Sequence, residues 1–135
     1  MVSMNNSGSS LSILIVEDDK SASEVLKLMI PLKFPDFRIH VAENGTAGLE
    51  LSNTFAPDIV ITDINLPGMD GLQMAEQIKT MRTTTKFIVI TGYSDKIHLE
   101  KFSRIGICEY ILKPIELQRL FAAIEKCVGE IKLER

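Results

Sequence analysis

Short apolar segments alternate with longer amphipathic segments along the chain. The apolar segments lie at residues 11–16, 37–42, 58–63, 86–91 and 108–112. Each is brief and rich in β-branched residues, which favours strands over helices. The third and fourth are apolar almost throughout, a pattern typical of strands that are covered on both faces. The sequence therefore predicts five strands, of which the central ones are buried.

The segments between and after the apolar runs carry hydrophobic residues at helical spacing. Five such stripes are present: Ala22, Val25, Leu26, Met29 and Ile30; Ala47, Leu51 and Phe55; Leu72, Ala75 and Ile78; Ile97, Phe102 and Ile105; and Leu117, Leu120, Phe121, Ile124, Val128 and Ile131. A capping box from Ser21 to Glu24 is expected to open the first helix. Five strand–helix units in succession predict an α/β fold with a single doubly wound parallel sheet and helices on both faces.

The composition agrees with this fold and limits the class of protein and the kinds of partner to expect. The chain has 135 residues, 45% hydrophobic and 24% charged, as expected for one globular domain with a real core. A formal net charge of −3 argues weakly against broad nucleic-acid binding and gives no case for binding an anionic membrane surface. No apolar run approaches the roughly 20 residues of a membrane span. We therefore expect neither nucleic acid nor membrane among the partners.

The termini and the cysteines add two smaller expectations. Residues 1–10 lack the basic and apolar regions of a signal peptide and are interpreted as a flexible tail, with the domain at 11–135. Cys108 and Cys127 have no metal-type spacing and are too few for a disulfide framework. Reduced thiols in a cytoplasmic protein are the plain interpretation.

Polar residues gather where the predicted strands end, which is where doubly wound sheets bind ligands. The residues in question are Glu17, Asp18, Asp19, Asp63, Thr91 and Lys113. Crowded carboxylates raise the pKa of at least one member unless a cation compensates. Oxygen ligands without clustered His or Cys suit a hard divalent ion, Mg²⁺ or alternatively Mn²⁺. Lys113 supplies a mobile point charge for a phosphoryl oxygen, and Thr91 supplies a hydroxyl donor.

Four motifs at the strand ends carry a family resemblance. They are "ILIVEDD", "DIVITDINLPGMDG", "FIVITGYSD" and "EYILKPI". With these in order, the chain resembles the receiver domains of two-component response regulators, of the chemotaxis type, over roughly Ser12 to Arg135. The resemblance implies a flavodoxin-like sheet of order 2-1-3-4-5. It also implies Mg²⁺-dependent transfer of a phosphoryl group to Asp63 from a histidine kinase or phosphotransfer protein.

The resemblance further implies a role for each residue at this edge. Asp63 would accept the phosphoryl group and contribute to the metal site. Asp18 would bind the metal directly, with Glu17 nearby or acting through water, and Asn65 would offer its backbone carbonyl. Thr91 would donate a hydrogen bond to the phosphoryl group, and Lys113 would pair with it.

Other positions would relay or time the signal. The rotamer of Tyr110 would report the state of Thr91, while Asn65 and Tyr93 would flank the phosphoryl group and tune its lifetime. The Lys113–Pro114 bond is a candidate for the cis form. Phosphorylation would then change the surface formed by the fourth helix, the fifth strand and the fifth helix. That surface would bind an unknown output protein or domain, and a homodimer through it is one alternative.

Some of these residues also have a purely structural interpretation. Asp19 suits capping or charging the first helix as well as it suits metal, and it is left out of the site. Asp70 is expected to be a helix N-cap or a turn residue rather than a ligand. A pseudo-receiver that binds without phosphate would lack the acceptor or the acidic pair, and both are present. A phosphatase of the haloacid dehalogenase type would need an aspartate where Asn65 stands. A flavin-binding flavodoxin would need a phosphate loop where the three acids follow the first strand. The preferred interpretation is a signalling switch that catalyses only its own phosphorylation and dephosphorylation, either standing alone or as part of a larger regulator.

Overall fold

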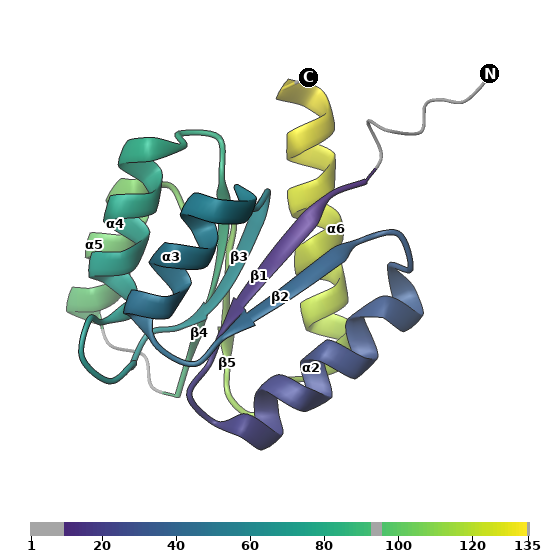
Figure 1. The fold of residues 1–135 in the computed structure, drawn as a ribbon, viewed down its shortest axis with the longest axis horizontal. Coiled ribbons are helices and arrows are strands. Elements are labelled where there is room, and N and C mark those ends of the chain that lie inside the picture. Colours follow the sequence, from purple (N-terminus) through teal and green to yellow (C-terminus); the bar gives the residue numbers. More distant parts are fainter. Residues whose placement is uncertain (1–9, 93–95, 135) are drawn as a thin grey trace.

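The computed structural model describes residues 10–92 and 96–134, without the side chains of 96–99. Strands and helices alternate throughout this part of the chain (Figure 1). In chain order the elements are β1 (Ser12–Val16), α2 (Lys20–Lys33), β2 (Arg38–Ala42), α3 (Gly45–Phe55), β3 (Ile59–Asp63), α4 (Gly71–Met81), β4 (Lys86–Thr91), α5 (Lys96–Ile105), β5 (Glu109–Leu112) and α6 (Leu117–Glu134).

The five strands form one parallel sheet in the order β2-β1-β3-β4-β5. Because order reverses after β2, strands β1 and β3 are neighbours although a complete strand–helix unit separates them in sequence. The crevice of such a sheet lies where the order reverses, at the carboxyl ends of β1 and β3. The predicted α/β architecture, its strand count and its strand order are confirmed.

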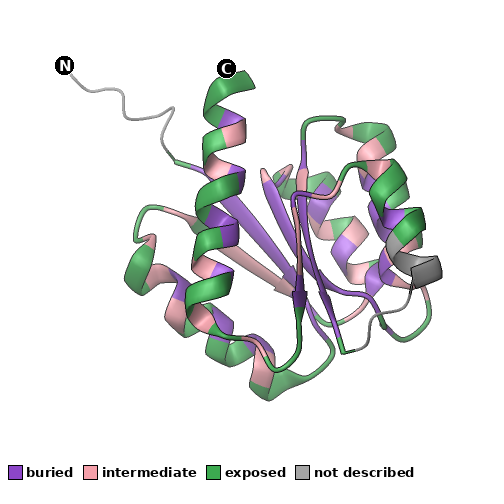
Figure 2. Cartoon of the chain, turned by 180° about the vertical axis from the view of Figure 1, so that it is seen from behind, coloured by how far each residue is buried: buried purple, intermediate pink, exposed green. Residues whose placement is uncertain are grey.

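Helices cover both faces of the sheet. Figure 1 shows α2 and α6 on one face and α3, α4 and α5 on the other. Each side has its own hydrophobic cluster, one centred on Ile15, Ile61 and Ile124 and the other on Val60, Met74 and Phe87. Strands β1 and β3 are buried along their whole length, whereas the edge strand β2 is only partly covered (Figure 2). The sheet is therefore a rigid platform whose carboxyl edge remains reachable.

Details of the first helix differ from the sequence-based expectation. The helix begins at Lys20 with Asp19 as its N-cap, so the capping box expected from Ser21 to Glu24 is wrong. Leu26 and Ile30 face the core as predicted, but Val25 is 51% exposed. Helical spacing places Val25 beside Leu26, at the border of the buried stripe rather than within it.

Among the described residues, no helix is both long enough and apolar enough to pass through a bilayer.

Candidate functional site

The site residues are held by backbone hydrogen bonds that continue the sheet beyond the strand ends. The Glu17 N–H donates to the Ala42 carbonyl at 3.0 Å. The N–H of Ile64, directly after Asp63, donates to the Ile90 carbonyl at 2.9 Å, and that of Lys113 donates to the Thr91 carbonyl at 2.8 Å. These hydrogen bonds fix the main chain at three of the strand ends where the sequence predicts site residues.

Three acidic side chains meet in the crevice between β1 and β3. Glu17, Asp18 and Asp63 each offer a carboxylate oxygen, and these atoms lie within 4.8 Å of one another. Glu17 and Asp63 are buried, at 3% and 4% exposure, while Asp18 is exposed. Two buried acids and one exposed acid therefore form a cluster that solvent reaches at Asp18.

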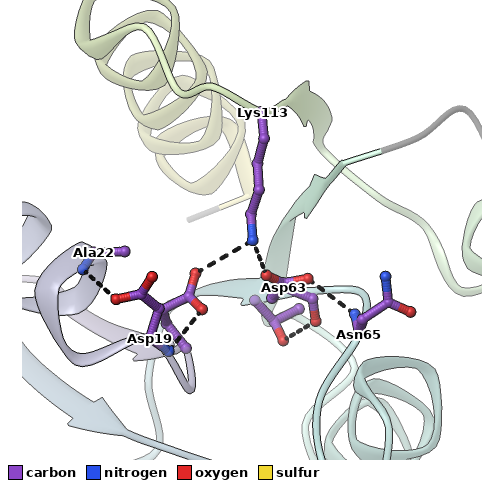
Figure 3. Close-up of polar contacts among 7 residues, drawn as sticks. Asp19, Ala22, Asp63, Asn65 and Lys113 are labelled. Atoms are coloured by element: carbon purple, nitrogen blue, oxygen red, sulfur yellow. Dashed lines mark hydrogen bonds and ion pairs between the residues drawn. The ribbon is translucent and has the colours of Figure 1, made fainter.

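Lys113 is the cation that reaches these acids from the end of β5. Its ammonium group is hydrogen-bonded and ion-paired to Oδ2 of Asp63, and its Nζ lies 3.9 Å from Oε1 of Glu17 (Figure 3). Burial by itself would lower the pKa of Lys113, but the hydrogen bond and the charge of Asp63 outweigh it, and the pKa is raised. The lysine is therefore a permanent positive charge facing Asp63.

The carboxylate of Glu17 is only partly satisfied. Oε2 accepts the Asp19 N–H at 3.1 Å, but the buried Oε1 has no hydrogen-bond partner within residues 10–92 and 96–134. Burial is the main cause that raises the pKa of Glu17, ahead of the opposing contributions of the Asp19 N–H and Lys113. An under-satisfied buried oxygen in an all-oxygen cluster is what a hard divalent cation requires. The residues present therefore fit Mg²⁺.

The Asp63 carboxylate is oriented on both oxygens. Oδ1 of Asp63 accepts the backbone N–H of Asn65 at 2.9 Å, while Oδ2 faces Lys113 (Figure 3). The loop after β3 thus returns its own main chain to Asp63. Asn65 itself is exposed.

The proposed switch residues lie on the adjoining strands. Thr91 ends β4 and is 2% exposed; the residue before it, Ile90, pairs with Asp63 in the sheet. Tyr110, on β5, packs partly buried against the cluster under α3, α4 and α5, and burial raises its pKa. Tyr93 lies outside the described residues, so its tuning role stays a prediction.

Two acids that the sequence suggested as helix caps are caps. Oδ1 of Asp19 accepts the Ala22 N–H at 3.1 Å (Figure 3). Oδ1 of Asp70 accepts the Gln73 N–H at 2.8 Å, and the Gln73 side chain returns the bond to the Asp70 N–H. The Lys113–Pro114 bond is cis, as the resemblance implied.

Sequence reasoning missed two features of the site. One is Thr62, whose hydroxyl donates to the Asp63 carbonyl at 3.0 Å. The other is a groove beside the acid cluster, which is lined by Val25 of α2 and by Pro114 and Ile115 of the β5–α6 loop. Neither has a local signal, since Thr62 looks like any strand residue and the groove joins segments far apart in sequence.

Comparison with known proteins agrees with this geometry. A model of the response regulator receiver domain matches residues 13–125. The regulatory protein AtoC of Escherichia coli is 30% identical over 116 residues, covering 86% of this chain and 25% of that protein. The probable C4-dicarboxylate response regulator DctR of Bacillus subtilis is 32% identical over 114 residues, covering 84% and 50%. The chain thus spans a quarter to a half of the length of these relatives.

Solved structures give the same result. A CheY-like response regulator receiver domain protein from Methanospirillum hungatei superposes with a TM-score of 0.85 at 27% identity, covering 93% of this chain and 98% of that one. The N-terminal domain of an uncharacterized protein from Wolinella succinogenes has a TM-score of 0.84 at 35% identity, covering 93% and 99%. The chain therefore belongs to the response regulator receiver domains of two-component systems, a family in which phosphorylation and Mg²⁺ binding at an acidic pocket are typical.

Proposed function

We propose that residues 11–135 form one receiver domain, behind a tail at 1–10, and that Asp63 is its phosphoacceptor. The observation that carries this proposal is the pairing of Asp63 with Lys113 inside a cluster of acids. A buried carboxylate that already faces a cation can receive a phosphoryl group without first recruiting a counter-charge.

In this proposal an oxygen of the Asp63 carboxylate attacks the phosphorus of the donor. An oxygen–phosphorus bond forms, and the bond from phosphorus to the donor nitrogen or oxygen breaks. The Asn65 N–H orients Oδ1 of Asp63, while Lys113 offsets the charge brought by the phosphoryl oxygens. The Thr91 hydroxyl donates to one of those oxygens as the group arrives.

Glu17, Asp18 and Asp63, with the backbone carbonyl of Asn65, would hold Mg²⁺, or Mn²⁺ in its place. A bound divalent ion would supply charge neutralisation between the two anionic reactants. The orphaned oxygen of Glu17 supports this assignment from the side of the protein.

The donor we propose is a histidine kinase or a phosphotransfer protein. Its approach is supported by the groove between α2 and the β5–α6 loop, which opens beside Lys113. Val25 of this groove is half exposed, which gives an incoming helix an apolar surface next to the acceptor.

The output surface we propose is the face of α5, β5 and α6. Thr91 and Tyr110 link it to the acceptor, and Leu112 offers an apolar side chain there at 53% exposure. Its partner would be an output protein or domain, or a second copy of this chain. The chain would catalyse only its own phosphorylation and dephosphorylation, and its cytoplasmic location stays a prediction.

The test is intact-mass spectrometry after incubation with acetyl phosphate, with and without Mg²⁺. We expect a Mg²⁺-dependent gain of one phosphoryl group that Asp63→Asn abolishes. The matched control is Asp36→Asn, which removes an exposed carboxylate away from the acid cluster and should leave the gain unchanged. The proposal fails if the wild-type chain neither gains mass nor binds beryllofluoride, and a pseudo-receiver then becomes the better interpretation.

A further inference from the structure

The main-chain carbonyl of Asp63 has two close neighbours, Thr62 and Gly71. The Thr62 hydroxyl donates to it at 3.0 Å. Gly71, the first residue of α4, lies so close that a Cβ added there would stand 2.6 Å from the Asp63 carbonyl oxygen, 3.4 Å from Oγ1 of Thr62 and 3.5 Å from Cα of Ile64. Real Cβ atoms essentially never approach a backbone atom to 2.6 Å, so only glycine fits this contact without displacement.

Helix α4 has little freedom to move away from this contact. Its first turn is closed by the reciprocal capping box between Asp70 and Gln73. Its inner face carries Met74, Ala75 and Ile78, all at 0% exposure. Retreat of the helix would open a void beneath those side chains, which costs free energy in a close-packed interior.

Sheet hydrogen bonds also fix the neighbouring main chain, but only as far as Ile64. The last sheet hydrogen bond on this strand runs from the Ile64 N–H to the Ile90 carbonyl at 2.9 Å. Beyond it the chain enters a loop that reaches α4. A side chain at position 71 would therefore press on the peptide that joins Asp63 to Ile64, where the ladder ends.

We propose that Gly71 and Thr62 are positioning residues for the acceptor. The carbonyl and the carboxylate of Asp63 share one Cα, so a shift of the carbonyl turns the carboxylate. Its partners Lys113, Glu17 and Asp18 come from other strands and would not follow the shift. The inference rests on the proposed function and adds two residues that touch neither phosphoryl group nor metal.

The experiment compares four variants of the full chain with the wild type. Gly71→Ala adds the Cβ, and Thr62→Val removes the hydroxyl at nearly constant volume. Thr62→Ser keeps the hydroxyl and is the rescue variant. Gly129→Ala is the control, because a Cβ there meets nothing within 4 Å. The readouts are the acetyl phosphate phosphorylation rate, the amide NMR shifts of Asp63 to Asn65, and the melting temperature.

A fifth variant separates positioning from loss of stability. Gly45→Ala places a Cβ 2.3 Å from the Met69 carbonyl oxygen, a closer contact at the far end of the same loop. We expect Gly71→Ala to phosphorylate about tenfold to a hundredfold more slowly than wild type. Gly45→Ala should lose more stability but less rate, because its contact lies six residues from the acceptor.

Four results would overturn the inference. The first is a folded Gly71→Ala protein whose phosphorylation rate and amide shifts equal those of Gly129→Ala. The second is a phosphorylation rate in Gly45→Ala that is reduced as much as in Gly71→Ala. If Gly71→Ala does not fold, the decision falls to Thr62→Val, which should be several-fold slower than Thr62→Ser; equal rates refute the proposal. If the wild type is not phosphorylated, the proposed function fails. The positioning inference is then tested separately, and unchanged amide shifts at Asp63 to Asn65 in Thr62→Val would refute it.

Discussion

Tyr110 lies at the border between the hydrophobic core and the outer surface. Its ring packs partly buried against the cluster under α3, α4 and α5. The next residues alternate along β5, with Ile111 buried and Leu112 exposed. A phenol at such a border is sensitive to small changes in packing, because inward rotation would bury its hydroxyl further and outward rotation would expose it to water.

The ionisation of Tyr110 gives a test at the scale of this residue. Burial raises its pKa above the ordinary value of 10.0, because the phenolate is harder to solvate in the fold. The unfolded chain therefore ionises first: the stabilising contribution is complete below about pH 10 and is lost as pH rises through the folded pKa. Subtracting the phenolate absorbance titration of Tyr110→Phe from that of wild type should give a midpoint above pH 10.

Only two tyrosines are present, so this difference isolates one of them. Beryllofluoride with Mg²⁺ should move the midpoint higher still if the ring turns inward on activation. A midpoint at or below pH 10 would contradict the burial argument. A midpoint unaffected by beryllofluoride, in a chain that binds it, would contradict the switch role.

At the scale of elements, the helix starts decide where the site loops end. Helices α2 and α4 both start with an aspartate whose side chain accepts a backbone N–H of the first turn. These caps satisfy donors that have no partner inside the helix. Because each cap follows a site loop directly, the helix start and the loop end are one structural unit.

The cap of α4 can be tested through stability. Asp70→Ala removes the acceptor for the Gln73 N–H and breaks the reciprocal box, so we expect a loss of about 1 kcal/mol in the free energy of unfolding. Asp70→Asn retains a side-chain oxygen and should lose much less. Urea denaturation followed by circular dichroism measures both. Equal losses for the two variants would mean that the charge, rather than the capping oxygen, stabilises the helix.

How far the sequence predicts these elements depends on whether a signal is local. The five strands were predictable because each apolar run is short and β-branched. Val25 was misassigned because residue spacing predicts a buried stripe but not where its edge lies. The Ser21 capping box was wrong because Asp19, two residues earlier, offers its own side chain to the first turn.

The same reasoning explains the site. Asp63, Lys113 and the acids were predictable because each follows its own strand and the topology then brings them together. Thr62 and Gly71 were not, because their role depends on the distance between a helix start and one carbonyl oxygen. Such a distance is set by the packing of Met74 and Ile78, and no spacing in the chain encodes it.

At the scale of the whole molecule, the site concentrates like charge on an otherwise apolar platform. The sheet is packed on both faces, and its carboxyl edge holds three acids opposed by Lys113. Repulsion among those acids costs stability that a bound cation would recover. A Mg²⁺ ion bound at the proposed site would therefore be thermodynamically linked to the fold.

Thermal denaturation measures this linkage. At a Mg²⁺ concentration ten times its Kd we expect about 1.4 kcal/mol of added stability, from the mass-action relation for a ligand of the native state. For a chain of this length that raises Tm by about 5 °C. Sodium chloride at matched ionic strength should not reproduce the rise, and the double variant Asp18→Asn, Asp63→Asn should abolish it. An unchanged Tm at Mg²⁺ concentrations that support phosphorylation would refute the linkage.

The ladder that fixes the strand ends has a consequence for the life of the chain. Asp63 and its cation are 50 residues apart, and the acids, the hydroxyl and the ammonium follow four different strands. In the proposed reaction, a chain that has not yet closed its sheet through β5 would contain Asp63 but not the groups that surround it. Phosphorylation would then be confined to molecules with a complete sheet, so the phosphorylated fraction would also report how many molecules have folded.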